Sequence, residues 1–325
     1  MTILSRLSLA VLVPLLVASS FAQTPAACSY ASHYTIIRVP LQLARINNSG
    51  LIAGLDEENQ LAIWTQSHIV QKIVTPPDFR GARVTGLNDE GDIVGQVPTT
   101  EAGKIQAFGF IHGSLRILAG PQSKAKAIDD AGQVAIEQYP GGPFLWSGNK
   151  LLPLGGCCGG SVSAINEHGQ IAGELNDGEA SYSAFVWGPE RGLQIVGPPA
   201  VRSAALAINN AGHTLIQTFS PNHLFLRREG RLTPVELSPE FVSQPRGLND
   251  CDVIVGEYYG PSSDQRAFIW DRKNGFRDLN GLVDKTEGWI LESAIDINGR
   301  GEIIGTGDHQ NESGVGFLLV PENAK

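Results

Sequence analysis

The stretch INEHGQIAG, from Ile165 to Gly173, decides the fold, because its pattern occurs seven times in the chain. Each copy has an aliphatic residue, then Asn or Asp, then a short polar segment that usually ends in glycine, and then a run of aliphatic residues. The Asn or Asp recurs at spacings of 41, 41, 37, 43, 40 and 49 residues. These repeat residues are Asn47, Asn88, Asp129, Asn166, Asn209, Asn249 and Asn298. Such a period is typical either of four-stranded propeller blades or of helical-pair repeats.

The segments inside each repeat indicate β-strands. Asn or Asp followed by glycine is the chemistry of a tight turn, because the side chain bonds nearby backbone and glycine tolerates a positive φ. A second phrase follows, such as AFVW up to Trp187, and then a weaker third phrase, such as LQIVG. None of these segments has apolar residues at helical spacing. The sequence therefore predicts four short antiparallel strands per repeat and an all-β, seven-bladed β-propeller of four-stranded blades.

The two ends of the repeat region are complementary. The seventh repeat stops after its GFLLV segment, which ends at Val320, and lacks a fourth strand. The segment YTIIRV, from Tyr34 to Val39, precedes the first repeat and has the composition of a strand. We predict that it pairs with the segment from Gly316 to Val320, completes the last blade and closes the ring. Residues 34–322 then form a single propeller domain.

Residues 1–22 have the features of a signal peptide. Arg6 is their only charge, the segment from Leu7 to Val17 is apolar, and Ser20 and Ala22 are small residues at the positions that signal peptidase reads. An uncleaved anchor is disfavoured, because the apolar run is short and contains Pro14. We predict a secreted or periplasmic protein with a linker at residues 23–33, a polar tail at 323–325 and no membrane span after cleavage. We expect a monomer.

The charge of the chain is acidic. It has 24 Lys and Arg against 33 Asp and Glu, a net charge of −9, and loss of Arg6 with the signal peptide makes the charge −10. A negative surface repels phosphate groups, so nucleic acid and anionic lipid are disfavoured as partners.

The repeats, of the form A-x-x-IN-x-x-G followed by AF-hydrophobic-W, resemble the HAF family of bacterial extracellular repeat proteins. The match covers about Ala44 to Pro321 and is best in Ala164–Trp187 and Gly247–Trp270. The resemblance implies secretion and a propeller-like fold, and it implies no activity. The chain departs from the pattern at a few positions, which we expect to weaken individual blades: Asp129 for Asn, Ile136 and Ile216 for the closing glycine, and Cys251-Asp252 in the sixth turn.

The repeat Asn and Asp residues are interpreted as structural turn residues. A calcium loop needs several carboxylates at alternating positions, and most of these turns have one acid or none. We therefore expect no metal and no cofactor. The recurring aromatics Trp146, Trp187 and Trp270 are interpreted in the same way, as core residues.

The four cysteines suggest disulfides, because free thiols are disfavoured in an exported protein. The candidate pairs are Cys157–Cys158, which are adjacent in a glycine-rich connection, and Cys28–Cys251. Unpaired thiols are the alternative.

A charged pair is expected at the closure of the ring. Two residues before the repeat residue, five repeats have Gly or Ala, but the first has Arg45 and the last has Asp296. The first and last blades are neighbours in a closed ring, so we predict a partly buried salt bridge between these residues. A charged channel that binds a ligand is the alternative.

The sequence contains no motif for nucleophilic catalysis, and its seven histidines are scattered. A binding site is predicted instead on the face formed by the long loops between second and third strands and by the connections between blades. These loops have aromatic and acidic residues that suit stacking on sugars or on a protein groove: Tyr182, Tyr258, Tyr259, Trp289, Asp177, Glu179 and Asp264.

Two functions follow from these observations. The favoured one is a secreted, non-catalytic propeller that presents its loop face to an unidentified protein or polysaccharide. The alternative is an extracellular carbohydrate-active hydrolase or lyase, with acids from several blades at the axial pocket.

Overall fold

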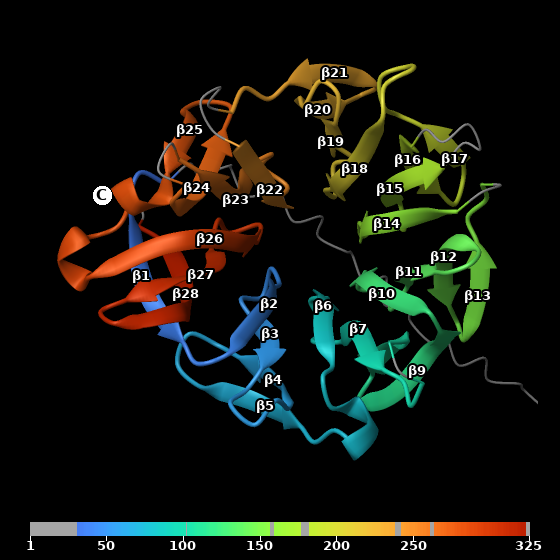
Figure 1. Cartoon of the computed structure of the whole chain (residues 1–325), viewed down its shortest axis with the longest axis horizontal. Coiled ribbons are helices and arrows are strands. Elements are labelled where there is room, and N and C mark those ends of the chain that lie inside the picture. Colours follow the sequence, from blue (N-terminus) through green and yellow to red (C-terminus); the bar gives the residue numbers. More distant parts are fainter. Residues whose placement is uncertain are drawn as a thin grey trace, which may run out of the picture.

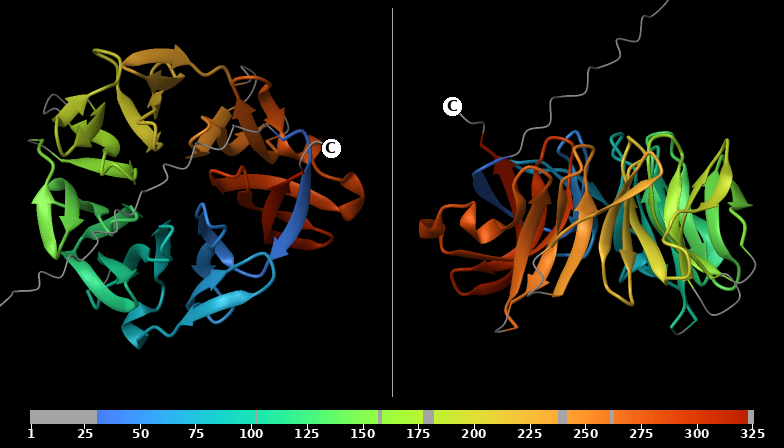
Figure 2. Two further views of the ribbon diagram at one scale, coloured as in Figure 1. Left: turned by 180° about the vertical axis from the view of Figure 1, so that it is seen from behind. Right: turned by 90° about the horizontal axis from the view of Figure 1, so that it is seen from above.

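The computed structural model describes residues 31–322, except 102, 157–158, 177–181, 238–241 and 261–262. It contains seven four-stranded antiparallel sheets arranged radially around a central axis (Figure 1). The prediction of an all-β, seven-bladed propeller is therefore confirmed. Seen from the side, the blades stand next to one another, and their strands cross from one face of the ring to the other (Figure 2).

Strands occupy equivalent places in the seven blades, from the axis outward. The innermost strands are β2 (Gln42–Ile46), β6 (Arg83–Leu87), β10 (Ser123–Ile128), β14 (Gly160–Ile165), β18 (Ser203–Ile208), β22 (Val242–Leu248) and β26 (Trp289–Ile297). The second strands are β3 (Ile52–Leu55), β7 (Ile93–Pro98), β11 (Val134–Gln138), β15 (Ile171–Asn176), β19 (Thr214–Thr218), β23 (Ile254–Tyr259) and β27 (Ile303–His309). The third strands are β4 (Leu61–Trp64), β8 (Ile105–Ile111), β12 (Gly142–Ser147), β16 (Tyr182–Gly188), β20 (Leu224–Arg228), β24 (Gln265–Asp271) and β28 (Glu312–Pro321). The outer strands are β5 (Ile69–Ile73), β9 (Ser114–Pro121), β13 (Lys150–Pro153), β17 (Gly192–Ile195), β21 (Arg231–Pro234), β25 (Gly275–Asp278) and β1 (Tyr34–Val39).

The ring is closed by the strand nearest the N-terminus. β1 pairs with β28 in antiparallel register from Tyr34 opposite Pro321 to Val39 opposite Gly316, and β1 lies at the outer edge of the last blade (Figure 1). The closure predicted from the missing fourth strand is confirmed. Short 3-10 segments also occur at η1 (Pro77–Phe79), η2 (Leu279–Gly281) and η3 (Lys285–Glu287).

Every innermost strand contains a register shift near its turn. At this shift, the residue three positions before the repeat residue has no partner in the second strand. These unpaired residues are Ala44, Thr85, Lys126, Ser163, Leu206, Arg246 and Ile295. A bulge of this kind bends a strand and increases its twist. The repeated bulge therefore gives all seven inner strands the same bend next to the axis.

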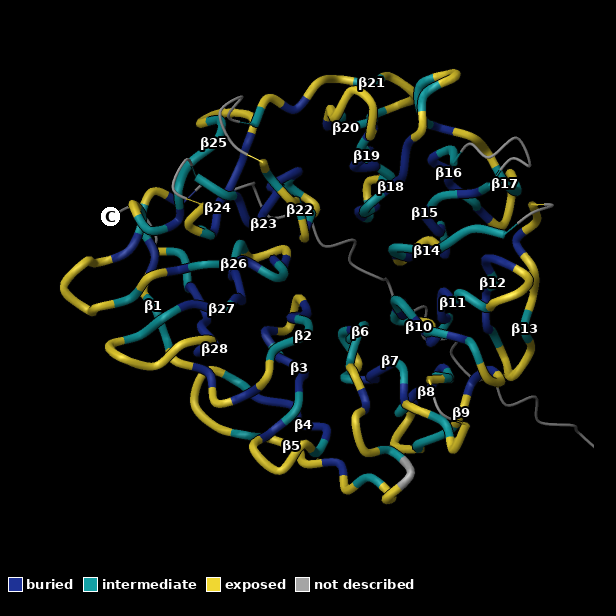
Figure 3. Tube along the Cα trace, viewed as in Figure 1, coloured by how far each residue is buried: buried dark blue, intermediate teal, exposed yellow. Residues whose placement is uncertain are grey.

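The core lies between neighbouring blades, where buried residues of the second and third strands meet (Figure 3). The closing glycine of the repeat has a packing role there. At Gly173 an added Cβ would lie 2.1 Å from the Ser161 carbonyl oxygen and 2.8 Å from the ring of Phe185, which is fully buried. Where Ile136 replaces this glycine, the opposite Phe144 is only partly buried. Because glycine has no side chain, the aromatic ring of the opposite residue can occupy the space next to its Cα and be fully buried.

The two faces of the ring differ in their connections. We call the face with the turns between first and second strands the turn face. The opposite face, which has the loops between second and third strands and the connections between blades, is the loop face. Among the described residues, no helix has the length and apolar character needed to cross a bilayer.

Candidate functional site

A small pocket lies on the axis at the turn face. Its volume is about 200 Å³, and it is lined by the ends of all seven inner strands and by turn residues of every blade except the third. Because every blade contributes the same part of its repeat, the chemistry of the pocket follows directly from the repeated turn sequence.

The repeat residue of each turn caps its own turn. Its side-chain oxygen accepts a hydrogen bond from the backbone N–H four residues later in all seven blades, as between Asn166 and Gln170 at 3.0 Å. In six blades the side-chain amide also donates to the backbone carbonyl of the repeat residue in the next blade, at 2.8–3.1 Å. The donors are Asn47, Asn88, Asn166, Asn209, Asn249 and Asn298. We call this arrangement the amide ring.

The amide ring also spans the closure of the propeller, since Asn298 donates to the Asn47 carbonyl at 2.9 Å. It is interrupted at one place. Asp129 takes the position of asparagine in the third blade and has no amide to donate toward Asn166. The Asp129 side chain is buried, and burial raises its pKa to about 6, with a further contribution from the charge of Asp130.

A second ring lies at the mouth of the pocket, one residue further along each turn. The side chain at this position accepts a hydrogen bond from the backbone N–H of the equivalent residue in the preceding blade, at 2.7–3.0 Å. The acceptors are Asp89, Asp130, Glu167, Asn210, Asp250 and Asn48. Gly299 occupies the seventh position and has no side chain to accept. This ring was not among the predicted sites, although an acid or amide follows the repeat residue in six of the seven units.

Glu167 has the most perturbed carboxyl group of this second ring. Withdrawal from water raises its pKa to about 7, and the charges of Asp130, Asp129 and Asp89 add to this effect. Glu167 is exposed at the mouth of the pocket, beside acids of the neighbouring blades.

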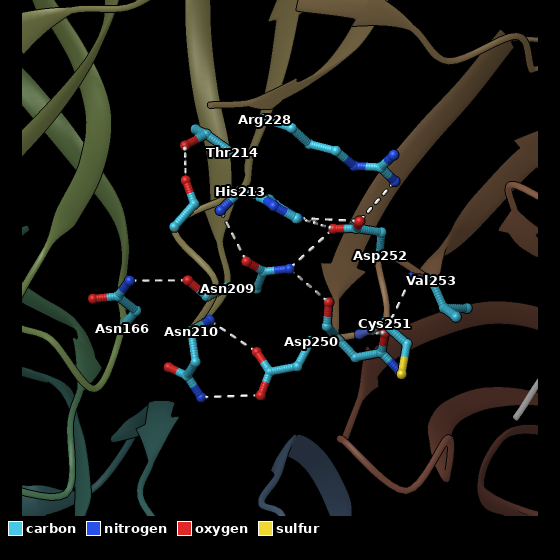
Figure 4. Close-up of polar contacts among 12 residues, drawn as sticks. Asn166, Asn209, Asn210, His213, Thr214, Arg228, Asp250, Cys251, Asp252 and Val253 are labelled. Carbon is cyan, nitrogen blue, oxygen red and sulfur yellow. Dashed lines mark hydrogen bonds and ion pairs between the residues drawn. The ribbon is translucent and has the colours of Figure 1, made fainter. Parts of the chain in front are cut away.

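The sixth turn, where the repeat glycine is replaced by Asp252, is stabilised by a polar network (Figure 4). Asp252 has a positive φ of 58°, the backbone conformation for which the other turns use glycine. Its carboxylate accepts from Arg228 at 2.6 Å, from His213 Nδ1 at 2.9 Å and from Asn209 at 3.0 Å. The aspartate that replaces glycine therefore joins the sixth blade to the fifth through Arg228, His213 and Asn209.

The loop-face residues singled out from the sequence differ in their exposure and in their contacts. Tyr258 is buried and donates to Asp278 at 3.0 Å, and Trp289 stacks on His309 with ring centres 4.3 Å apart. Tyr258 is thus buried with a polar partner, and the partly buried Trp289 is covered on one side by His309. Tyr259 is half-buried and Asp264 is exposed. Asp177 and Glu179 lie outside the described residues.

Tyr182, by contrast, belongs to a cluster of side chains from separate segments that no motif in the sequence predicts. The guanidinium of Arg202, just before β18, lies 5.2 Å from the centre of the Tyr182 ring and 5.0 Å from that of Phe219. The Phe219 ring is 40% exposed on the loop face. In the neighbouring third blade, Tyr139 follows β11 at the same face and is 74% exposed. We call Tyr182, Arg202 and Phe219 the aromatic–arginine patch.

The predicted salt bridge between Arg45 and Asp296 is not formed. No ion pair within 4.0 Å joins these two described residues, because Asp296 accepts from the backbone N–H of Ile46 and of Ile297, at 3.3 and 3.0 Å. Arg45 instead donates to the carbonyl of Ala44 at 2.7 Å. Burial raises the pKa of Asp296, and the nearby charge of Arg45 opposes this effect.

Of the four cysteines, only Cys251 lies in the described part of the chain. It is disulfide-bonded and packs against the core cluster that contains Ala31 and Tyr34. Cys28, Cys157 and Cys158 lie outside the described residues, so the pairings Cys28–Cys251 and Cys157–Cys158 stay predictions. Within the described ranges, no three His, Cys, Asp or Glu side chains are placed to hold a metal ion.

Comparisons with known proteins show the fold and nothing finer. No protein-family model matches the chain, and no curated protein matches it. Virginiamycin B lyase from Staphylococcus aureus is similar in structure, with a TM-score of 0.58, 12% identity, and coverage of 89% of this chain and 99% of the lyase. The β-propeller domain of Cps50 (Swd1) from Myceliophteria thermophila has a TM-score of 0.57 and 13% identity, covering 89% of this chain and all of that domain. YCF48, solved with a D1 peptide, has a TM-score of 0.56 and 10% identity, over 93% of this chain and 99% of YCF48.

Proposed function

We propose that the protein is an exported, non-catalytic binding scaffold that presents its loop face to an extracellular protein or polysaccharide. The observation that supports this function is the aromatic–arginine patch, where Arg202 lies between Tyr182 and Phe219. Exposed Tyr and Arg are enriched at the energetic centres of interfaces, and aromatic rings offer flat surfaces for sugar rings. We further propose membership of the HAF-repeat proteins, export through residues 1–22 to the periplasm or medium, and a monomeric state.

The dimensions of the axial pocket support a scaffold over an enzyme. Its volume of about 200 Å³ is smaller than the roughly 300–1,000 Å³ of ordinary small-molecule sites. The carboxylates at its mouth, such as Asp89 and Asp250, already accept backbone hydrogen bonds that join neighbouring blades. Propeller folds host both binding and catalysis, as a peptide-bound YCF48 and a lyase illustrate, so the fold itself does not decide between them.

The proposal is tested with the mature chain, residues 23–325, by affinity electrophoresis against extracellular polysaccharides and by cross-linking to cell-surface proteins. Arg202→Ala and Phe219→Ala are expected to weaken binding, since the first removes the guanidinium between the two rings and the second removes one of the rings. Arg272→Ala, which changes an exposed arginine in the sixth blade, is the matched control. Binding that is unchanged in both patch variants would show that the loop-face patch is not the site.

A second function, a carbohydrate-active hydrolase or lyase, is favoured by one observation. Glu167, with a pKa of about 7, lies beside acids of other blades and could act as a general acid at neutral pH. The test is turnover of the same polysaccharides, followed by release of reducing ends. Turnover that Glu167→Gln abolishes, while the variant keeps its melting temperature, would establish the enzyme and reject the scaffold.

A further inference from the structure

A polar groove opens on the turn face between the fourth and fifth blades. Its volume is about 660 Å³, and its walls are the hairpin between β16 and β17 and the hairpin between β20 and β21. Asn210 lines both this groove and the axial pocket, so the groove leads outward from the axis. It lies on the face opposite the aromatic–arginine patch.

The groove contains a departure from the repeat. In each blade, one residue of the third strand lies opposite the first residue of the second strand, and in six blades both partners are apolar. The third-strand residues in those blades are Trp64, Phe110, Trp146, Trp187, Trp270 and Leu319. In the fifth blade the pair is Thr214 and Arg227. A guanidinium therefore occupies the place where the other blades use an apolar side chain for packing.

Arg227 has no counterion in the described part of the chain. No hydrogen bond or ion pair within 4.0 Å of its side chain occurs there, and the same is true of Arg191 on the facing hairpin. Partial burial lowers the pKa of Arg227, and the positive charge of Arg191 contributes to this effect. The half-buried Arg228 and Arg277 are different, because each forms an ion pair of 2.6 Å with a carboxylate.

A partly buried arginine such as Arg227 is costly unless an anion offsets its charge. Withdrawing a charge from water is unfavourable, and placing a second like charge nearby adds to the cost. Glu190 and Glu229 also line the groove, but neither makes an ion pair with Arg191 or Arg227. The groove thus has two arginines and two glutamates that do not pair with one another, on a chain with a net charge of −9.

We propose that this groove binds an oxyanion group of an acidic saccharide, held between Arg191 and Arg227. Guanidinium groups recognise carboxylates, sulfates and phosphates through paired N–H donors. The groove also presents His168, Gln170 and Gln194, whose polar groups can hydrogen-bond sugar hydroxyls. A neutral saccharide would leave both arginines without a counterion, so the site selects for acidic ligands.

The test is affinity electrophoresis of the mature chain in gels with polygalacturonate, chondroitin sulfate or neutral dextran, with inorganic phosphate as competitor. We expect retardation by one or both acidic polymers and none by dextran. Polygalacturonate presents only carboxylates, so the pattern across the two polymers identifies the preferred oxyanion. Competition by phosphate at millimolar concentration would show that a free oxyanion is sufficient for the site.

Two variants locate the binding. Arg227→Trp restores the aromatic residue of the repeat and is expected to fold, while Arg191→Gln changes an exposed hairpin residue. Each should weaken binding about tenfold or more, the effect of losing one charge-assisted contact. Arg272→Gln makes the same charge change outside the groove and should bind as the parent chain does. Arg202→Ala on the loop face should also leave this binding intact, which separates the groove from the proposed scaffold patch.

Any of three results would overturn the inference. The first is that neither acidic polymer retards the parent chain, and the second is that dextran retards it equally. The third is that both groove variants bind as tightly as the Arg272→Gln control.

Discussion

Replacing Asp129 with asparagine is expected to stabilise the propeller at neutral pH. Asp129 is the repeat residue that interrupts the amide ring, and its carboxylate cannot donate toward the Asn166 carbonyl as the amides of the other blades do. An ionised Asp129 is also buried, which raises its pKa from 3.8 to about 6. Asparagine would remove the charge and supply the missing donor with almost the same shape.

The size of the effect follows from the pKa difference between the folded and unfolded states. A shift of about two pH units corresponds to about 3 kcal/mol. The folded state holds the proton more tightly, so the stability of the parent chain falls as pH rises from about 4 to about 6. Above that range the full penalty is present. Asp129→Asn should therefore add about 2–3 kcal/mol at about pH 8 and little near pH 4.

The assay is thermal unfolding followed by circular dichroism at several pH values. Unfolding entropy of about 0.6 kcal/mol per kelvin, expected for roughly 290 ordered residues, converts the gain into about 4 °C. The reverse variant, Asn166→Asp, places a carboxylate at the next position of the ring and should lower the melting temperature at about pH 8 by a similar amount. A gain in Asp129→Asn of the same size at pH 4 and pH 8 would refute the reasoning, because an electrostatic penalty must disappear with the charge.

Three further predictions concern the ring and its packing. Deletion of Tyr34–Val39 should open the ring and give aggregated or protease-sensitive protein in limited proteolysis, since β28 would lose its outer partner and become an exposed edge. Gly256→Ala should lower stability by about 1–3 kcal/mol in urea unfolding, because the new Cβ would lie 2.2 Å from the Gln244 carbonyl oxygen. Gly120→Ala, where nothing lies within 4 Å, is its control and should be near neutral. Asp252→Gly restores the repeat glycine but leaves the Arg228 charge without its carboxylate, so a net loss of about 2 kcal/mol is expected. A net gain would mean that the backbone strain at a φ of 58° outweighs the network.

The fold could be predicted from the sequence because each repeat contains the residues that determine its own turns and strands. The turn residue, the glycine and the aromatic phrase specify hairpins, and seven of them leave few architectures available. Closure by Tyr34–Val39 followed from counting strands. These inferences succeed because turn chemistry and strand alternation act over only a few residues.

The side chains of the loop-face site and the contact between Arg45 and Asp296 were much harder to predict from the sequence. Tyr258 and Trp289 looked like loop-face aromatics, yet the tertiary structure engages both with internal partners. The stack of Tyr182, Arg202 and Phe219 joins two blades and three separate segments, so no local pattern could show it. Arg45 and Asp296 were correctly placed on adjacent blades, but adjacency did not determine the contact, because the backbone N–H groups near Asp296 are closer partners.

What the sequence determined by itself is the unit of construction: four strands, a capped turn, and seven copies that close through the N-terminal strand. What only the tertiary structure decided is which side chains of different copies face one another. The amide ring, the second ring at the pocket mouth and the groove between the fourth and fifth blades all depend on contacts between repeats about forty residues apart. The physical reason is the range of the forces involved. Turn and strand preferences are set by neighbours along the chain, whereas charge, burial and hydrogen bonding at the axis depend on how seven separate units are placed in space.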